Sequence, residues 1–129
     1  MSYRVLLVDD SKLARMSLAA ALRRLRPDWR CVEAAGPNQA LEMLSSEPVD
    51  ITLIDFNMPD MDGLTLAASI RQSHPDMPMA IVSANSQTAI ITGARALNVA
   101  FVTKPVTDEA LNAFLSGASL RLRKTTNNG

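Results

Sequence analysis

The feature that most restricts the fold of this chain is an alternation of two kinds of segment. Short apolar runs recur along the sequence, and a longer segment with helical periodicity follows each of them. The first run, Val5 to Val8, is apolar throughout and ends in charge, which is typical of a strand buried on both faces. The other expected strands are residues 31–35, 51–54, 79–83 and 99–103. Five strand–helix units predict an α/β domain with a parallel sheet, right-handed crossovers and helices on both faces.

The helical segments carry their own start and stop signals. Ser11 can cap the first helix and Pro27 ends it, while a stripe at i, i+3, i+4 and i+7 marks its buried side. That stripe consists of Leu18, Ala21, Leu22 and Leu25. Asn38 is expected to cap a second helix over residues 39–44. The third and fourth helices are expected over residues 64–72 and 88–97, and the last helix begins near Thr107.

Composition narrows the class of protein. The 129 residues suit one domain, and 47% of them are apolar, which is enough for a core. Lys plus Arg and Asp plus Glu balance at 13 each, so no strong overall field favours nucleic acid. No apolar stretch approaches the roughly 20 residues that cross a bilayer, and the first residues lack a signal-peptide pattern. We expect a cytoplasmic protein without direct nucleic acid binding or membrane insertion, with one domain over residues 1–124 and a polar, disordered tail over residues 125–129.

Several conspicuous side chains are interpreted as structural. The lone cysteine, Cys31, lies in a strand-like run, so we expect a buried small hydrophobe and not a reactive thiol. Trp29 is expected to pack at the start of the second strand, and His74 to lie on the surface after the third helix. The early arginines are interpreted as a solvated helix face: Arg15, Arg23, Arg24, Arg26 and Arg30.

Charged residues follow three of the apolar runs at the point where each run ends. Asp9 and Asp10 follow the first run, Asp55 follows residues 51–54, and Lys104 follows residues 99–103. In an open parallel sheet, the residues at the carboxyl ends of strands converge on one crevice. Carboxylates from two strand ends can hold a hard cation there, and a lysine from a third can neutralise what the cation holds.

Five motifs in this order resemble the receiver domain of two-component response regulators, of the chemotaxis-regulator type. They are Val8-Asp9-Asp10-Ser11, Leu53-Ile54-Asp55, Met58-Pro59-Asp60-Met61-Asp62-Gly63, Ser83-Ala84 and Lys104-Pro105. The resemblance covers residues 3 to 122. It implies a flavodoxin-like (βα)5 fold with a five-stranded parallel sheet in the order 2-1-3-4-5, and a signalling domain that catalyses its own phosphotransfer and dephosphorylation.

The resemblance assigns the phosphoryl chemistry to three residues. Asp55 would accept a phosphoryl group as an aspartyl phosphate, and a carboxylate suits this because its product, an acyl phosphate, can be hydrolysed again. Lys104 would pair with the phosphoryl group, and the Ser83 hydroxyl would donate to one of its oxygens. The resemblance also implies a cis bond between Lys104 and Pro105.

The resemblance further implies a Mg²⁺ site. Asp10 would bind the ion directly and Asp9 mainly through water, with Asp55 and the backbone carbonyl of Asn57 as further ligands. Such oxygen ligands suit Mg²⁺, which keeps several of its waters. In the loop between Asn57 and the third helix, Asp60 and Asp62 are interpreted as turn formers or as a cap for that helix.

The chain departs from the family pattern at its output side. Phe101 occupies the position of a switch aromatic, where many members have tyrosine, and is expected to switch together with Ser83 between two arrangements. Ser83 itself replaces the commoner threonine, which keeps the hydroxyl and loses a methyl group. Leu97-Asn98 stands where a small Gly-Ala pair is common, which puts the end of the fourth helix in doubt.

Three other functions compete with that of a phosphorylated signalling domain. A haloacid-dehalogenase-type phosphatase would have a second Asp two residues after the nucleophile, where this chain has Asn57. A flavodoxin-like cofactor binder would need a hydroxyl- and glycine-rich loop after the first strand, where Asp9 and Asp10 would repel a phosphate. A degenerate receiver that acts only as a protein-interaction module is the third, and the retention of the acids, the hydroxyl and the lysine argues against it.

The expected partners follow from the resemblance. A sensor histidine kinase or a histidine phosphotransfer protein would donate the phosphoryl group, and a downstream protein, not identified by the sequence, would read the result. The resemblance also allows a phosphorylation-dependent dimer. The chain is either a stand-alone receiver or a piece of a larger protein.

Overall fold

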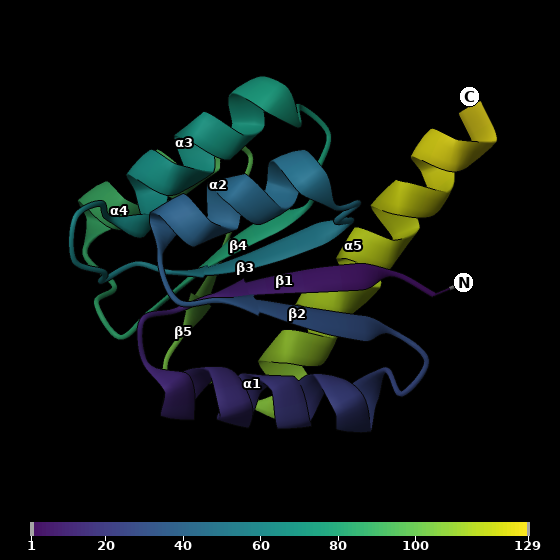
Figure 1. The fold of residues 1–129 in the computed structure, drawn as a ribbon, viewed down its shortest axis with the longest axis horizontal. Helices are drawn as coiled ribbons and strands as arrows, with labels where there is room; N and C mark the ends of the chain where they lie inside the picture. The colour runs from purple at the N-terminus through teal and green to yellow at the C-terminus, as the bar shows by residue number, and fades with distance from the viewer. Residues whose placement is uncertain (1, 129) are drawn as a thin grey trace.

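The computed structural model describes residues 2–128, in which strands and helices alternate along the chain (Figure 1). The strands are β1 Arg4–Val8, β2 Arg30–Ala34, β3 Ile51–Asp55, β4 Met79–Ser83 and β5 Ala100–Thr103. The helices are α1 Lys12–Leu25, α2 Pro37–Ser46, α3 Gly63–Ser73, α4 Thr88–Ala96 and α5 Asp108–Asn128. Every expected strand and helix is present, and each strand is followed by its expected helix.

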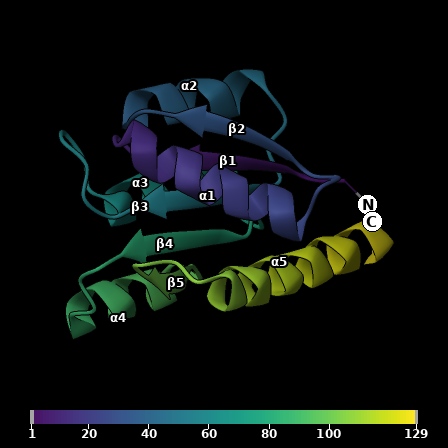
Figure 2. The same cartoon turned by 90° about the horizontal axis from the view of Figure 1, so that it is seen from below.

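The five strands form one parallel sheet in the order β2-β1-β3-β4-β5. This order confirms the fold that the resemblance implied. Helices α1 and α5 cover one face of the sheet, and α2, α3 and α4 cover the other (Figures 1 and 2). Central β1, β3 and β4 are almost entirely buried, which is why their sequences are predominantly apolar.

The core has two parts because successive strand residues point to opposite faces of the sheet. In β1, Val5 and Leu7 pack with the buried residues of α1 and α5. Leu6 and Val8 pack with those of α2, α3 and α4. Among the helices of residues 2–128, none is both long enough and apolar enough to cross a membrane.

Two helices differ from the sequence-based expectation at their ends. Helix α2 begins at Pro37 with Gly36 as its N-cap, so the assignment of Asn38 as the cap is wrong. Proline suits the first helical position because its missing N–H needs no partner there. At its other end, α2 continues two residues past the expected end, to Ser46. Helix α5 continues to Asn128, past the expected end near residue 124, and Gly129 lies outside the described residues. The disorder expected of residues 125–129 stays a prediction.

The turn after α4 accommodates the unusual Leu97-Asn98 pair. Asn98 has a φ of 57°, in the left-handed region that asparagine tolerates better than most residues. The Arg71 guanidinium, from α3, then joins this turn to the loop before β4. It donates hydrogen bonds to the carbonyls of Leu97, Asn98, His74, Pro75 and Met77, at 3.1, 3.1, 3.2, 3.1 and 2.7 Å respectively. The C-terminal end of α4 is thereby anchored to that of α3.

Candidate functional site

The acidic crevice lies where two neighbouring strands end. Strand β1 ends at Val8, directly before Asp9 and Asp10, and Asp55 is the last residue of β3. Because β1 and β3 are adjacent, with Val8 opposite Ile54, these acids meet at the point where the strand order reverses. Asp9, Asp10 and Asp55 each offer a carboxylate oxygen within 4.8 Å of those of the other two.

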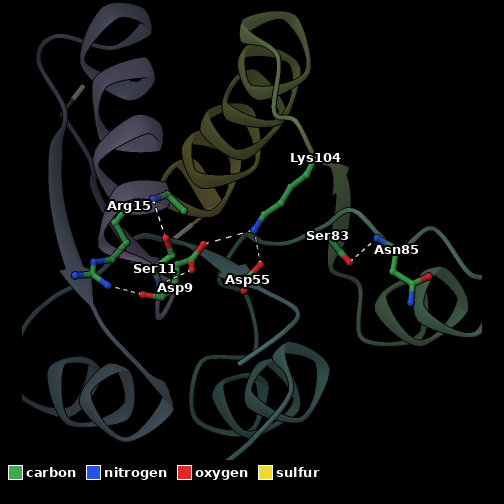
Figure 3. Close-up of polar contacts among 8 residues, drawn as sticks. Asp9, Ser11, Arg15, Asp55, Ser83, Asn85 and Lys104 are labelled. Carbon is green, nitrogen blue, oxygen red and sulfur yellow. Dashed lines mark hydrogen bonds and ion pairs between the residues drawn. The ribbon is translucent and has the colours of Figure 1, made fainter. Parts of the chain in front are cut away.

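Lys104 enters the same crevice from the end of β5 (Figure 3). Its Nζ lies 2.7 Å from Asp55 Oδ1 and 3.7 Å from Asp9 Oδ2. Its backbone N–H donates to the Ser83 carbonyl at 3.0 Å, which fixes the start of the loop against β4. The bond between Lys104 and Pro105 is cis, as expected.

The charges of this cluster are not balanced by the protein. Burial raises the pKa of Asp55, the nearby carboxylates of Asp9 and Asp10 raise it further, and the hydrogen bond from Lys104 only partly offsets them. For Lys104, burial acts to lower the pKa, but Asp55 and Asp9 raise it above its ordinary value, so the ammonium keeps its proton. Three carboxylates facing one ammonium leave excess negative charge, which suits a hard cation.

The two acids that follow β1 have different surroundings. Asp9 is buried, and its Oδ1 accepts a hydrogen bond from the Ser11 N–H at 2.9 Å. The Ser11 hydroxyl in turn accepts from the Ala14 N–H at 3.2 Å and caps α1. Asp10 is exposed. These contacts occupy Asp9 with protein partners and leave Asp10 facing the solvent.

Ser83 ends β4, the strand next to β3, and is buried. Its Oγ accepts a hydrogen bond from the Asn85 N–H at 3.0 Å (Figure 3). Asn85 Oδ1 in turn accepts from the Gln87 N–H at 3.0 Å. The Ser83 hydroxyl hydrogen is left free by this contact, since the oxygen acts as acceptor in it. Asn57 lies in the loop after β3, and its side chain is exposed.

The loop that follows Asn57 returns to the end of β3 at Gly63, whose N–H donates to the Phe56 carbonyl at 2.8 Å. Asp62 caps α3 by accepting from the Thr65 N–H at 2.8 Å, and Asp60 turns the chain with a φ of 72°, as expected of these two acids. A Cβ on Gly63 would lie 2.7 Å from the Asp55 carbonyl oxygen and 2.9 Å from Phe56 Cα. Gly63, the last residue of the motif, therefore lets α3 approach the backbone of Asp55.

The expected switch aromatic, Phe101, lies on β5 and is half-buried. It packs against the core on the α2, α3 and α4 side. It also lines a groove of about 590 Å³ between α4 and α5, with Ile91 and Arg95 on one wall and Phe114 and Arg121 on the other. This surface, made by α4, β5 and α5, is called the α4–β5–α5 face below.

Arg15 was missed by sequence reasoning as part of the site. The early arginines were assigned to a solvated face, but the Arg15 side chain is only 13% exposed. Its Nη1 donates to the Asp9 carbonyl at 2.6 Å, and its Nε lies 3.0 Å from Oε1 of Glu33, on β2 (Figure 3 shows the first of these contacts). Arg26 also departs from that assignment, since it donates to Asn112 Oδ1 at 2.8 Å and Ser116 Oγ at 3.0 Å of α5.

A cleft gives access to the acids from the side of α1. It has a volume of about 650 Å³ and extends between α1 and the loop that joins β5 to α5. Asp9, Asp55 and Lys104 lie on its wall, as do Arg15 and Arg24. Two of the three clustered acids and the lysine therefore border one open space on the α1 side of the sheet.

Comparison with known proteins places this chain in a family. Residues 5–116 match the family described as the response regulator receiver domain. The response regulator protein PilR of Pseudomonas aeruginosa is 37% identical over 121 residues, which are 93% of this chain and 26% of that protein. The sensor histidine kinase RcsC of Salmonella typhi is 36% identical over 126 residues, 94% of this chain and 13% of that protein. The chain thus spans about a quarter or less of either relative.

Solved structures share the fold at lower identity. A CheY-like response regulator receiver domain protein from Methanospirillum hungatei has a TM-score of 0.84 at 22% identity, covering 100% of both chains. The chemotaxis protein CheY4 of Vibrio cholerae has a TM-score of 0.82 at 22% identity, covering 92% of this chain and 99% of that one. Likeness at this level of identity shows the arrangement of strands and helices, and nothing finer.

Proposed function

Because the chain belongs to the response regulator receiver domain family, we propose that it is a signalling domain in which Asp55 accepts a phosphoryl group. The observation that carries the proposal is the position of the Asp55 carboxylate. It is buried, grouped with Asp9 and Asp10, and 2.7 Å from the Lys104 ammonium. The donor would be a sensor histidine kinase or a histidine phosphotransfer protein, the class of partner that this chemistry needs.

The proposed reaction is a displacement at phosphorus. An Asp55 carboxylate oxygen forms a bond to the phosphorus while the bond from phosphorus to the donor nitrogen breaks, and the electron pair leaves with the imidazole. Lys104 is already beside the carboxylate, where it would pair with the oxygens of the incoming phosphoryl group. The Ser83 hydroxyl, free to donate, would hydrogen-bond one of them. Later attack of water on the acyl phosphate would restore the carboxylate.

Mg²⁺ is the metal that this family implies, and the donor set fits it. Asp9, Asp10 and Asp55 offer clustered carboxylate oxygens, and the Asn57 carbonyl would add a further oxygen from the adjoining loop. When bound, the ion would neutralise charge on the phosphoryl oxygens. The residues themselves position the acceptor and keep its surroundings largely buried. The direct contact of Asp10 and the water-mediated contact of Asp9 are part of the same proposal.

The proposal distinguishes this chain from the competing functions. Membership in the receiver family argues against a haloacid-dehalogenase-type phosphatase and a flavodoxin-like cofactor binder. A degenerate receiver, acting only as an interaction module, would keep the fold and lose the phosphotransfer. The downstream target and any phosphorylation-dependent dimer would involve the α4–β5–α5 face, which contains Phe101.

A small phosphodonor tests the proposal without knowledge of the kinase. The purified protein should incorporate acid-labile phosphate from acetyl phosphate in the presence of Mg²⁺ and should fail to do so in excess EDTA. The control variant is Ser45→Ala, which alters an exposed residue near the C-terminal end of α2 and should be phosphorylated like the wild type. Absence of any incorporation by folded wild-type protein would favour the interaction module, and full incorporation in EDTA would remove the metal from the proposal.

A further inference from the structure

Arg15 holds the backbone that carries the acidic pair. We infer that Arg15 is a positioning residue for Mg²⁺ binding, acting through the Asp9 carbonyl and not through contact with the ion. The inference rests on the proposed function, because it names a residue that would prepare the proposed metal site. Its basis is the hydrogen bond from Nη1 to the Asp9 carbonyl oxygen at 2.6 Å.

The bonded oxygen belongs to the peptide group that joins Asp9 to Asp10. A peptide group is planar, so fixing its oxygen fixes the orientation of the whole plane and the position of the next Cα. That Cα carries Asp10, whose side chain is exposed. Asp9 is fixed a second time by the Ser11 N–H on its Oδ1 at 2.9 Å. Arg15 is thus placed to determine where the Asp10 carboxylate points.

Arg15 is itself held from a different element. Its Nε lies 3.0 Å from Glu33 Oε1, on β2, and its side chain is 13% exposed against 41% for Glu33. The guanidinium therefore bridges α1, the loop after β1 and β2. A lysine could not reproduce this, because an ammonium on a flexible stem lacks the rigid fork that reaches two acceptors in different directions. The Glu33 carboxylate also offsets a positive charge that would otherwise oppose a cation beside it.

An alternative role is purely structural, in which Arg15 only ties α1 to β2. The two roles predict different measurements. A structural tie would change the free energy of unfolding and leave the metal affinity of the folded protein unaltered. A positioning role changes the Mg²⁺ dissociation constant, since loss of such an outer partner typically weakens metal binding about 10–100-fold.

The test is a titration with Mg²⁺ alone, followed by the amide NMR signals of residues 9–11, together with thermal unfolding in EDTA. We expect Arg15→Ala to weaken Mg²⁺ binding by at least about tenfold. Arg23→Ala is the matched control. Arg23 lies on the same helix, is exposed, and lies outside the cleft that leads to the acids, so its loss removes one positive charge of α1 away from the site. It should leave the Mg²⁺ affinity unchanged.

Arg15→Ala that is folded and binds Mg²⁺ as tightly as the wild type would overturn the inference. If Arg15→Ala does not fold, Arg15→Lys serves in its place. We expect this variant to bind Mg²⁺ more weakly than the wild type, and an unchanged affinity would contradict the positioning role. Wild-type protein that shows no response to Mg²⁺ would overturn the proposed metal site and this inference with it. Failure of the inference alone is therefore distinguishable from failure of the proposed function.

Discussion

At the residue scale, Asp55 carries its charge in surroundings that oppose ionisation. Its side chain is 8% exposed, and burial together with Asp9 and Asp10 raises its pKa despite the ion pair with Lys104. Removal of this buried charge, which neighbouring carboxylates repel, should raise the free energy of unfolding, provided that the new side chain has the same shape. The residue that the proposed function needs most is therefore one that the folded state tolerates at an energetic cost.

Asp55→Asn separates these two effects. We expect phosphate incorporation from acetyl phosphate to be lost entirely, because an amide is not a nucleophile for this reaction. We also expect the free energy of unfolding in EDTA to rise, because the amide can still accept from Lys104 without the charge. Acid quench assays and thermal unfolding check the two parts. Phosphate at wild-type level on the variant would place the acceptor elsewhere, and a lower unfolding temperature would show that the pair with Lys104 stabilises more than burial destabilises.

Cys31 shows how burial lowers the reactivity of a thiol. It is half-buried on β2, beside the core that α1 and α5 cover, and burial, followed by Glu33, raises the pKa of its thiol to about 11. The thiolate is the reactive form, so alkylation by iodoacetamide at pH 8 should be slower than that of a short cysteine peptide. The rate should rise as the pH approaches about 11.

The raised pKa of Cys31 also makes the free energy of unfolding depend on pH. The contribution of the neutral thiol to the free energy of unfolding is fully present below its ordinary pKa of 9.0 and is lost as the pH rises through about 11. Cys31→Ala removes this dependence and serves as the control. Alkylation of the folded protein at the peptide's rate at pH 8 would contradict the expected protection.

At the scale of elements, Gly63 sets the distance between α3 and β3. A Cβ at this position would meet two backbone atoms, the Asp55 oxygen at 2.7 Å and Phe56 Cα at 2.9 Å. Backbone atoms cannot move aside as the end of a flexible side chain can. A change at the first residue of a helix therefore reaches the residue proposed as phosphoryl acceptor.

We expect Gly63→Ala to lower the free energy of unfolding by about 1–3 kcal/mol, the usual range for overpacking. We expect slower phosphorylation as well, because the backbone of Asp55 must shift. Gly117→Ala is the control, since nothing lies within 4 Å of the added Cβ in α5. A helical Gly→Ala change should stabilise by roughly 0.5–1 kcal/mol. Denaturant unfolding of both variants checks the opposite signs, and equal signs would contradict the steric argument.

Local signals predicted most element boundaries, and the failures have a physical cause. Strand ends were predictable where an apolar run meets a charged residue, as at Val8 and Asp9. At the start of α2 two signals competed, a capping Asn38 and a proline one residue before it. Proline fixes φ at a helical value before any side-chain hydrogen bond forms, so the helix begins at Pro37.

At the scale of the whole molecule, the acid cluster was predictable because it depends only on strand ends. Parallel strands deliver their last residues to one edge, so Asp9, Asp10 and Asp55 converge without knowledge of any side-chain packing. Arg15 was not predictable in this way. Its role depends on Glu33, which follows it by 18 residues and reaches it only because β2 pairs with β1. A charged residue on a helix gives no sign in the sequence of which strand it will face.

The route from the acids to the α4–β5–α5 face can be tested at Phe101. If phosphorylation draws Ser83 and residues 84–87 inward, Phe101 should favour a more buried rotamer, and amide chemical shifts of residues 88–103 should change. A typical coupling of about 1–3 kcal/mol would strengthen partner binding about 5–150-fold. Phe101→Ala should blunt both effects.

Phe114→Ala is the matched control for that change. Phe114 is also half-buried and lines the same groove, but it lies on α5 and packs with the core on the other face of the sheet. Its truncation should leave the shift changes of residues 88–103 largely in place. Shift changes that stay within the acid loops in the wild type, sparing residues 88–103, would show that the output does not take this route.

The hydrogen bonds from Arg71 fix the C-terminal end of α4, so that a displacement of this helix would be a rotation about that end. The fixed point is the turn at Leu97 and Asn98, tied to α3 at 3.1 Å through both residues, whereas the Gln87 side chain makes no capping hydrogen bond at the other end of the helix. A displacement that begins near Ser83 should therefore have its largest amplitude at Thr88 and fade toward Ala96. Amide hydrogen exchange should show the gradient as faster exchange at the Thr88 end, and a uniform rate along α4 would mean that the helix moves as a free body. The amplitude of a displacement of α4 would then be set by the turn at which the helix is held.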